Sequence, residues 1–424
     1  MSAMMGDNQP MSLITGLFNL LALLYIGRAV QMALQVSRNW SAVRQEPLTR
    51  EKQRLAEQAA FFLGVPPAVL VHELAHAVAV VAFGGRVVEF GYRVFWGYVV
   101  PSGTFTALEN WIIAVAGTLG SLSFGALLWL TLRRNPSRTL QYFGLRAFRF
   151  QIYFSLLYYP IFSLFLPIGD WRTIYDFAAT PLLSGATAAV HALLLLLFWR
   201  SDRTGAFEMV AFDSAAGQAR FQSTQAAADA GNPQAQLRAI SLLWSGGARR
   251  DARRSLKTFL SAYPTSAEGH LQLAIQAGDG SQQVNKDAYE AAGKALSLGL
   301  AGADQKALAH QLRSLYHLER GDGPAAETEL DAALTPSPFH DLDEIMPIRR
   351  AELHHLRSQA YRRQGRYEAA YAEVDQALRL AREMGLEPAI RKYADEKELI
   401  EKHAGRSLAE LLPDANPRGN PSGH

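Results

Sequence analysis

The stretch VLVHELAHAVAVVAFGG (residues 69–85) combines an apolar composition with three ionisable side chains, His72, Glu73 and His76. Its other residues are apolar or small, as in a helix that lies in lipid or in a protein core. A charged residue in the middle of a bilayer costs roughly 2.5–3.5 kcal/mol on insertion scales, so such residues usually have a function or a partner. The stretch therefore predicts an apolar helix with a functional polar site.

On an α-helix, His72 and His76 lie one turn apart on the same face, so both imidazoles can reach one ion. Glu73 lies on the adjacent face, where it can contact a water on that ion. This is the HExxH pattern, in which zinc lowers the pKa of a water and the glutamate accepts its proton. We expect His72 and His76 to bind Zn²⁺ and Glu73 to be the catalytic base. The alternative is a histidine pair satisfied by carbonyls or serine hydroxyls of neighbouring helices.

A catalytic zinc site needs a third protein ligand and an open position for water. The chain has no cysteine, so this ligand is a histidine, an aspartate or a glutamate. We expect it to be Asp170, in FLPIGDWRTIYD, with His191 as the second choice and Asp176 and Glu109 as loop candidates. The competing interpretations are that Asp170 caps a helix that begins at Trp171 and that His191 is a packing residue bonded to a carbonyl.

Five apolar segments in the first half of the chain are long enough to span a bilayer, which needs about 20 residues. They are residues 11–36, 59–83, 111–132, 148–168 and 181–199. Small residues recur in the third segment, where they would let helices approach closely. We interpret the first segment as a retained membrane helix and not as a signal peptide. The alternative, buried helices of a soluble protein, would require all five segments to be covered.

Lysine and arginine gather between the first and second segments, between the third and fourth, and after the fifth. By the positive-inside rule, the N-terminus lies outside and everything after residue 200 lies in the cytoplasm. Residues 84–110 contain alternating β-branched and aromatic residues with glycines, which predicts a short β-hairpin directly after the HELAH helix. We expect an integral, multi-pass protein of a bacterial inner or plasma membrane.

From about Phe207 onward, the sequence predicts paired amphipathic helices separated by turns. In the unit AELHHLRSQAYRRQGRYEAAYAEVDQALRLA, the positions Tyr361, Gly365, Tyr367 and Ala370 have spacings that resemble the tetratricopeptide repeat. A single helix pair cannot bury its apolar face, so we expect stacking into an α-solenoid with a protein partner in its groove. The Pro-, Gly- and Asn-rich tail is expected to be disordered.

Composition limits the classes of function. The chain has 424 residues, with 42 Lys and Arg against 39 Asp and Glu, giving a net charge of +3. The arginines cluster between apolar runs, which indicates contact with a bilayer and not with nucleic acid.

We predict four parts: a transmembrane helix and basic loop (1–57), a membrane-embedded metallopeptidase core (58–203), a helical repeat domain (204–411) and a disordered tail (412–424). The fold class expected is an all-α membrane protein with about five transmembrane helices, a β-hairpin and a soluble solenoid.

The HELAH helix, the Gly-Gly and β-like loop, the small-residue-rich helix and the aspartate after Leu-Pro-Ile together resemble the site-2 protease family of intramembrane zinc metallopeptidases. The resemblance covers residues 61–199. It implies that His72, His76 and Asp170 are zinc ligands and that Glu73 is the base. In this chain the aspartate lies in Ile-Gly-Asp-Trp, where the family usually has Leu-Asp-Gly. The family also tends to place the loop after the HExxH helix on the cytoplasmic side, whereas the arginines here place residues 84–110 outside.

The expected function is hydrolysis of a peptide bond in a membrane-spanning or membrane-adjacent substrate, with the helical repeats binding the substrate or a regulator. The alternative is a membrane-anchored repeat scaffold with a vestigial or structural metal site. The intact Glu73 disfavours the scaffold, because a structural zinc needs no water-activating glutamate. A transporter is a weaker alternative, because the sequence shows no inverted repeat.

Overall fold

The protein is described from a computed structural model that covers residues 9–165, 169–278, 284–335, 342–405 and 407–408. The chain forms two compact units: Met1–Ala227 with Leu242–Asp251, and Ala228–Ser241 with Ala252–His424. The first unit extends past residue 203 because the following segment packs back on it: the Phe212 backbone N–H donates to Leu48 O at 2.8 Å. The four-part division made from the sequence stays a prediction, and its tail lies outside the described residues.

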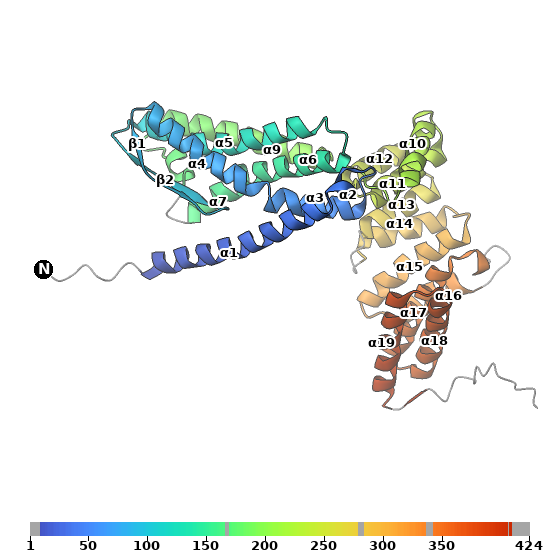
Figure 1. Cartoon of the computed structure of the whole chain (residues 1–424). Helices are drawn as coiled ribbons and strands as arrows, with labels where there is room; N and C mark the ends of the chain where they lie inside the picture. Colours follow the sequence, from blue (N-terminus) through green and yellow to red (C-terminus); the bar gives the residue numbers. More distant parts are fainter. Residues whose placement is uncertain (1–8, 166–168, 279–283, 336–341, 406, 409–424) are drawn as a thin grey trace, which may run out of the picture. The chain divides into compact units, whose positions relative to one another are not determined.

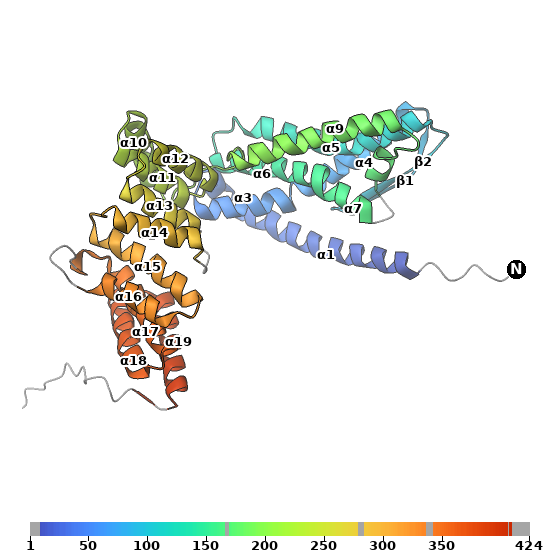
Figure 2. The ribbon, with the colours of Figure 1, turned by 180° about the vertical axis from the view of Figure 1, so that it is seen from behind.

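The first unit is built from helices and one hairpin (Figures 1 and 2). Its elements are α1 (Gln9–Arg38), α2 (Trp40–Arg44), α3 (Arg50–Phe62), α4 (Val65–Ala82), β1 (Arg86–Tyr92), β2 (Gly97–Ser102), α5 (Ala107–Leu132), α6 (Arg138–Tyr153), the π-helical turn η1 (Phe154–Tyr158), α7 (Tyr159–Phe165), α8 (Trp171–Ile174) and α9 (Pro181–Arg203).

The helix α4 carries the HELAH sequence and has clear local stop signals. It begins after Gly64, with two prolines in its first turn, where the missing N–H groups cost nothing. It ends at Ala82 and is followed by Gly84, whose φ of +77° is a conformation that favours glycine. There, the N–H groups of Gly84 and Gly85 donate to Val81 O and Val80 O, each at 3.0 Å. These bonds satisfy carbonyls that the helix end would otherwise leave free.

The predicted hairpin after α4 is confirmed. The strands β1 and β2 pair antiparallel, with Arg86 opposite Ser102 and Tyr92 opposite Gly97. The register shifts between Val87 and Glu89, as at a β-bulge. The hairpin connects α4 to α5 and lies beside α4.

The helix α5 begins with a capping box, in which Thr106 Oγ accepts from the Glu109 N–H and the Glu109 carboxylate accepts from the Thr106 N–H. Glu109 therefore lies in the first helical turn and not in a loop. Farther along, α5 packs closely on α4: a Cβ atom at Gly120 would lie 2.9 Å from Ala75 Cβ and 3.0 Å from Val71 O. The small residues of this segment thus allow the backbone contact that their pattern predicted.

Four helical runs in the described part of the chain are long and apolar enough to cross a membrane, by length and composition. They are Asn19–Arg38, Arg50–Ala82, Ala107–Leu132 and Pro181–Arg203. The sequence predicted about five such segments. The fourth of them, residues 148–168, does not form such a run among the described residues, which leave out 166–168. Arg149, Gln151 and three tyrosines make this stretch less apolar, and the π-helical turn η1 separates α6 from α7.

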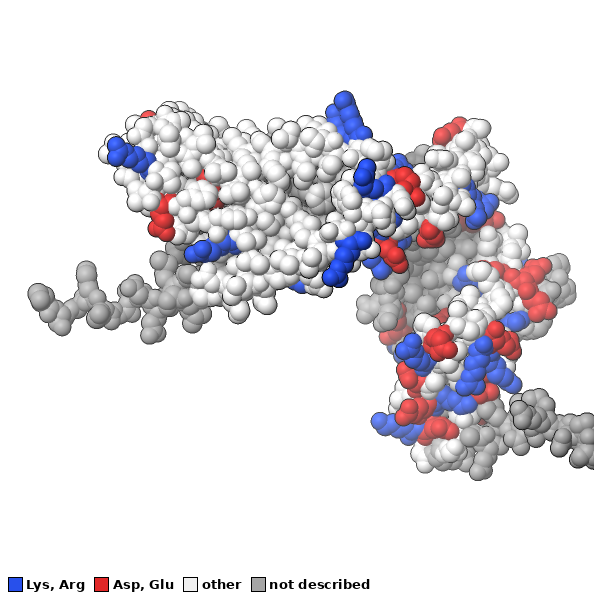
Figure 3. Space-filling model, viewed as in Figure 1, with Lys and Arg blue, Asp and Glu red and all other residues white. Residues whose placement is uncertain are grey.

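Figure 3 shows a nearly uncharged face over the middle of the first unit, whereas the second unit carries both signs of charge. Large apolar side chains are exposed along several of the membrane candidates. Examples are Val78 on α4 at 69% exposure and Leu182 on α9 at 88%. Exposed apolar surface of this kind is typical of proteins that contact lipid or another protein there.

The second unit consists of paired helices. The helices α10 (Ala215–Asp229), α11 (Pro233–Ser245) and α12 (Arg249–Ala262) contain residues of both units. Those that follow lie wholly in the second unit: α13 (Ala267–Gly278), α14 (Lys286–Ser297), α15 (Ala303–Glu319), α16 (Gly323–Leu334), α17 (Pro347–Arg363), α18 (Tyr367–Glu383) and α19 (Glu387–Ala404), with a 3-10 turn η2 (Leu342–Glu344). Apolar and small residues fill the space between consecutive helices.

Two of these helix pairs repeat the same ion-pair arrangement. In α15 and α16, His310 Nδ1 and Arg313 Nε each donate to the Glu329 carboxylate at 2.8 Å. The same three residue types recur 44 positions later, in α17 and α18, as His354, Arg357 and Glu373. The two pairs are therefore internal repeats, with a period longer than the 34 residues of the motif that the sequence resembles.

Candidate metal centre

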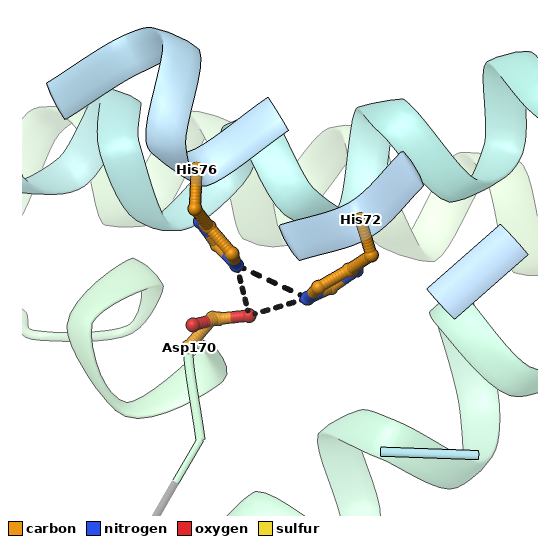
Figure 4. Close-up of side chains that lie close together, drawn as sticks. All are labelled: His72, His76 and Asp170. Carbon is orange, nitrogen blue, oxygen red and sulfur yellow. Dashed lines mark hydrogen bonds and ion pairs between the residues drawn. The ribbon is translucent and has the colours of Figure 1, made fainter. Parts of the chain in front are cut away.

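The helix α4 places His72 and His76 side by side, as their spacing predicted. Their Nε2 atoms lie 3.1 Å apart, and both rings point into the same space (Figure 4). His76 is buried and His72 partly buried. The two Nε2 atoms face the start of α8, on the far side of that space.

The opposite nitrogens of both rings are held by α5. His76 Nδ1 lies 2.7 Å from Ile113 O, which can only accept, so this nitrogen carries the proton. His72 Nδ1 lies 3.0 Å from Ser121 Oγ, which donates its own proton to Gly117 O. Ser121 therefore accepts from His72. In this network each histidine, when neutral, carries its proton on Nδ1 and presents a lone pair on Nε2, as in metal-binding histidines with an ordered second shell.

Asp170 completes the cluster from a distant part of the sequence. It precedes α8 as the N-cap residue, yet its side chain makes no capping hydrogen bond. Its Oδ2 atom lies 3.0 Å from His72 Nε2 and 3.1 Å from His76 Nε2 (Figure 4). The interpretation of Asp170 as a side-chain helix cap is therefore wrong, because the carboxylate points to the histidines.

Three lone-pair atoms thus converge within 3.1 Å of one another. A proton on one Nε2 atom would form a hydrogen bond in only one of the three contacts. Protons on both Nε2 atoms would place two cationic rings against each other. A divalent cation among the three atoms removes the repulsion. Ligand atoms about 2.0–2.1 Å from a tetrahedral zinc ion are about 3.3 Å apart, close to the separations found here. The donor set and its spacing therefore fit zinc.

Glu73, on the adjacent face of α4, is buried beneath β2. A Cβ atom at Gly97, the first residue of β2, would lie 2.5 Å from Glu73 Cγ and 2.9 Å from Oε1. No hydrogen bond or ion pair of the Glu73 carboxylate is found within the described ranges. A buried carboxylate without a protein partner is costly unless water or a ligand serves it. Glu73 is therefore available for proton transfer.

A glycine of α5 closes one side of the cluster. A Cβ atom at Gly117 would lie 2.3 Å from His76 Nε2 and 2.6 Å from His72 Nε2. The space in front of both nitrogens is thus bounded by bare backbone. Any side chain at this position would displace the histidines or fill the place of an ion.

The other candidate ligands are used elsewhere. His191 Nε2 donates to Leu156 O at 2.6 Å, and its Nδ1 accepts from the Tyr175 hydroxyl. Asp176 accepts from the Ala178 and Ala179 N–H groups at 3.1 and 3.0 Å, as in a turn. Glu109 belongs to the capping box of α5. The structure therefore brings His72, His76 and Asp170 together and leaves His191 as a packing residue.

Sequence reasoning missed the residues that hold these ligands in place. Ser121, the Ile113 carbonyl, Gly97 and Tyr159 contact the site from distant elements. The only signal in the sequence was the run of small residues around Gly117, which indicated close packing without identifying its partner.

Two shallow hollows lie on one face of the second unit. One, of about 620 Å³, is lined mainly by α17 and α19, and the other, of about 390 Å³, adds residues of α15. Pro388 and Lys392 line both, so the hollows adjoin each other. They combine charged side chains with apolar ones such as Ile348 and Leu399.

No family model matches the chain, and no curated protein matches it. Among solved structures, the crystal structure of the MamA protein is similar over 39% of this chain and 82% of its own, at 20% sequence identity and a TM-score of 0.29.

Proposed function

We propose that the chain is an intramembrane zinc metalloendopeptidase, of the kind that the site-2 protease resemblance implies. The observation that carries the proposal is the convergence of His72 Nε2, His76 Nε2 and Asp170 Oδ2 next to the carboxylate of Glu73, which has no hydrogen-bond partner among the residues that the structure describes. A purely structural histidine cluster would not need three acceptors facing one another, nor a buried glutamate beside them.

His72, His76 and Asp170 would hold the zinc ion, which when bound acidifies a water molecule and polarises the scissile carbonyl. Ser121 and the Ile113 carbonyl keep both imidazoles oriented with Nε2 toward the site. Glu73 takes the proton of the attacking water and gives it to the leaving amine. The bare backbone at Gly117 leaves room for the ion between the helices.

The surroundings support a substrate that lies in or beside the bilayer. The ligands lie on α4 and next to α8, and α4 and α5 both belong to runs that are long and apolar enough to cross a membrane. The hairpin β1–β2 reaches Glu73 through Gly97, and an extended substrate could pair with its free edge through backbone hydrogen bonds. We also propose that the part of the chain after residue 200 lies in the cytoplasm, as the distribution of lysine and arginine predicts.

For the second unit we propose a tetratricopeptide-like solenoid that binds a protein partner. The repeated helix pairs α15–α16 and α17–α18 and the hollows on α17 and α19 support it. In this arrangement the repeats bind a substrate tail or a regulator, while the first unit carries the chemistry. The alternative, a membrane-anchored scaffold, would require the three-acceptor cluster to be a vestigial or structural metal site without catalytic function.

The zinc content of the detergent-purified chain tests the proposal. We expect about one zinc per wild-type chain, strong loss in Asp170→Ala and full retention in His191→Ala. Glu73→Gln should keep its zinc, lose proteolysis and hold uncut membrane proteins that co-purify with it. Wild-type protein without zinc after metal-replete purification would overturn the peptidase and leave the scaffold.

A further inference from the structure

The hydroxyl group of Tyr159, the first residue of α7, makes two hydrogen bonds to Asp170. It donates to Asp170 Oδ2 at 3.0 Å and accepts from the Asp170 backbone N–H at 3.2 Å. Oδ2 is the same oxygen that contacts His72 and His76. One phenol therefore holds both the backbone and the carboxylate of Asp170.

A break in helical register places Tyr159 there. The π-helical turn η1 precedes it, and the Tyr159 N–H donates to Phe154 O, five residues back. A π turn accommodates one extra residue, so the side chains after it are rotated by about 100° relative to an uninterrupted α-helix. Without this turn, the residue at position 159 would point away from Asp170.

The ring of Tyr159 is also fixed by packing. Its centroid lies 5.7 Å from that of His72, with the two rings edge to face. Gly169, at a φ of +111°, lies against it: a Cβ atom at Gly169 would be 3.3 Å from Tyr159 Cε2. The phenol thus lies between one proposed ligand and the backbone that leads to another.

We propose that Tyr159 is the positioning residue for the aspartate ligand of the metal centre. This inference rests on the proposed function, because it assigns Tyr159 a role toward the zinc site. Asp170 precedes a four-residue helix and its side chain makes no capping hydrogen bond, so local structure does little to orient it. Outer-shell partners of this kind orient a ligand and typically contribute 10–100-fold to metal affinity.

The test compares Tyr159→Phe with Tyr158→Phe in the full-length, detergent-purified chain. Both variants lose one phenolic hydroxyl, but Tyr158 is 51% exposed and its ring lies against that of Tyr153. Zinc affinity is measured by competition with a chelator, and the visible spectrum of Co²⁺ in the site reports its coordination. We expect Tyr159→Phe to bind zinc about 10–100-fold more weakly and to shift the Co²⁺ bands, and Tyr158→Phe to match the wild type.

A Tyr159→Leu variant separates the hydrogen bonds from the ring packing. Tyr159→Phe loses only the hydroxyl, whereas Tyr159→Leu also loses the ring that packs on His72. We expect most of the loss of zinc affinity in Tyr159→Leu to be present already in Tyr159→Phe. Zinc affinity equal to the wild type in Tyr159→Phe would overturn the role of Tyr159, and weak binding in Tyr159→Leu alone would then assign the effect to packing. A wild-type chain that binds no zinc would overturn the metal centre itself.

Discussion

Gly97 lies so close to Glu73 that a Cβ atom there would be 2.5 Å from Glu73 Cγ, which places the backbone of β2 directly over the proposed base. We expect Gly97→Ala to fold, because a glutamate side chain can move aside. The moved carboxylate would no longer meet the attacking water, and a misplacement of about 1 Å can cost roughly 100-fold in rate.

The expected result for Gly97→Ala is therefore normal zinc content with about 100-fold lower proteolysis. Gly27→Ala is the matched control, because nothing lies within 4 Å of a Cβ atom at that position. Full activity in Gly97→Ala would show that Glu73 does not depend on the hairpin backbone.

Gly117→Ala should abolish zinc binding. The new methyl group would lie 2.3 Å from His76 Nε2 and 2.6 Å from His72 Nε2, and it is attached to a rigid helix. Metal analysis of the purified variant checks this, with Gly185→Ala in α9 as the control because its Cβ would meet open space. Normal zinc content in Gly117→Ala would contradict the position given to the ion.

Ser121→Ala should weaken zinc binding by about 10–100-fold without removing it. The substitution deletes the acceptor for the His72 Nδ1–H, which then no longer holds its tautomer and ring orientation. Ser123→Ala, two residues later on the exposed side of α5, should leave the affinity unchanged. Chelator competition measures both.

His191→Ala should keep its zinc and lose stability. The substitution leaves Leu156 O and the Tyr175 hydroxyl without their partner, and a buried unsatisfied group costs about 1–3 kcal/mol. Thermal unfolding in detergent together with metal analysis would separate this structural effect from ligand loss. Zinc lost from His191→Ala but kept in Asp170→Ala would exchange the two assignments.

The ion pairs of the second unit predict a stability that falls in acid. Burial by itself raises the pKa of Glu329, but hydrogen bonds from His310 and Arg313 outweigh it and lower the pKa to about 2. A carboxyl group whose pKa is lowered on folding stabilises the folded state at pH values above its ordinary pKa of 4.5. This contribution disappears as the pH falls toward 2.

Glu329→Gln should therefore be less stable than the wild type at neutral pH, by an amount on the order of 1–2 kcal/mol after allowance for solvent screening of the pair. The difference should shrink between pH 4.5 and about 2, the two pKa values of this group. Denaturant unfolding followed by circular dichroism measures it. Glu290→Gln is the control, because the exposed pair of Glu290 with Lys286 contributes little.

Sequence spacing was sufficient for the parts of the site that depend on local geometry. His72 and His76 share a face because an α-helix repeats every 3.6 residues, and the same geometry places Glu73 on the adjacent face. Gly84 and Gly85 end α4, and the alternation after them forms the hairpin. Each of these features is determined within a few residues along the chain.

The tertiary structure decided what depends on contacts between distant segments. Asp170 and His191 were both plausible ligands by residue type, and only packing brings Asp170 within 3.1 Å of residues almost a hundred positions earlier. The positions of Ser121, Gly97 and Tyr159 depend likewise on how α5, β2 and the π turn pack around α4. Local sequence determines which way a side chain faces on its own helix, whereas the identity of its neighbour is decided by the burial of whole faces against one another.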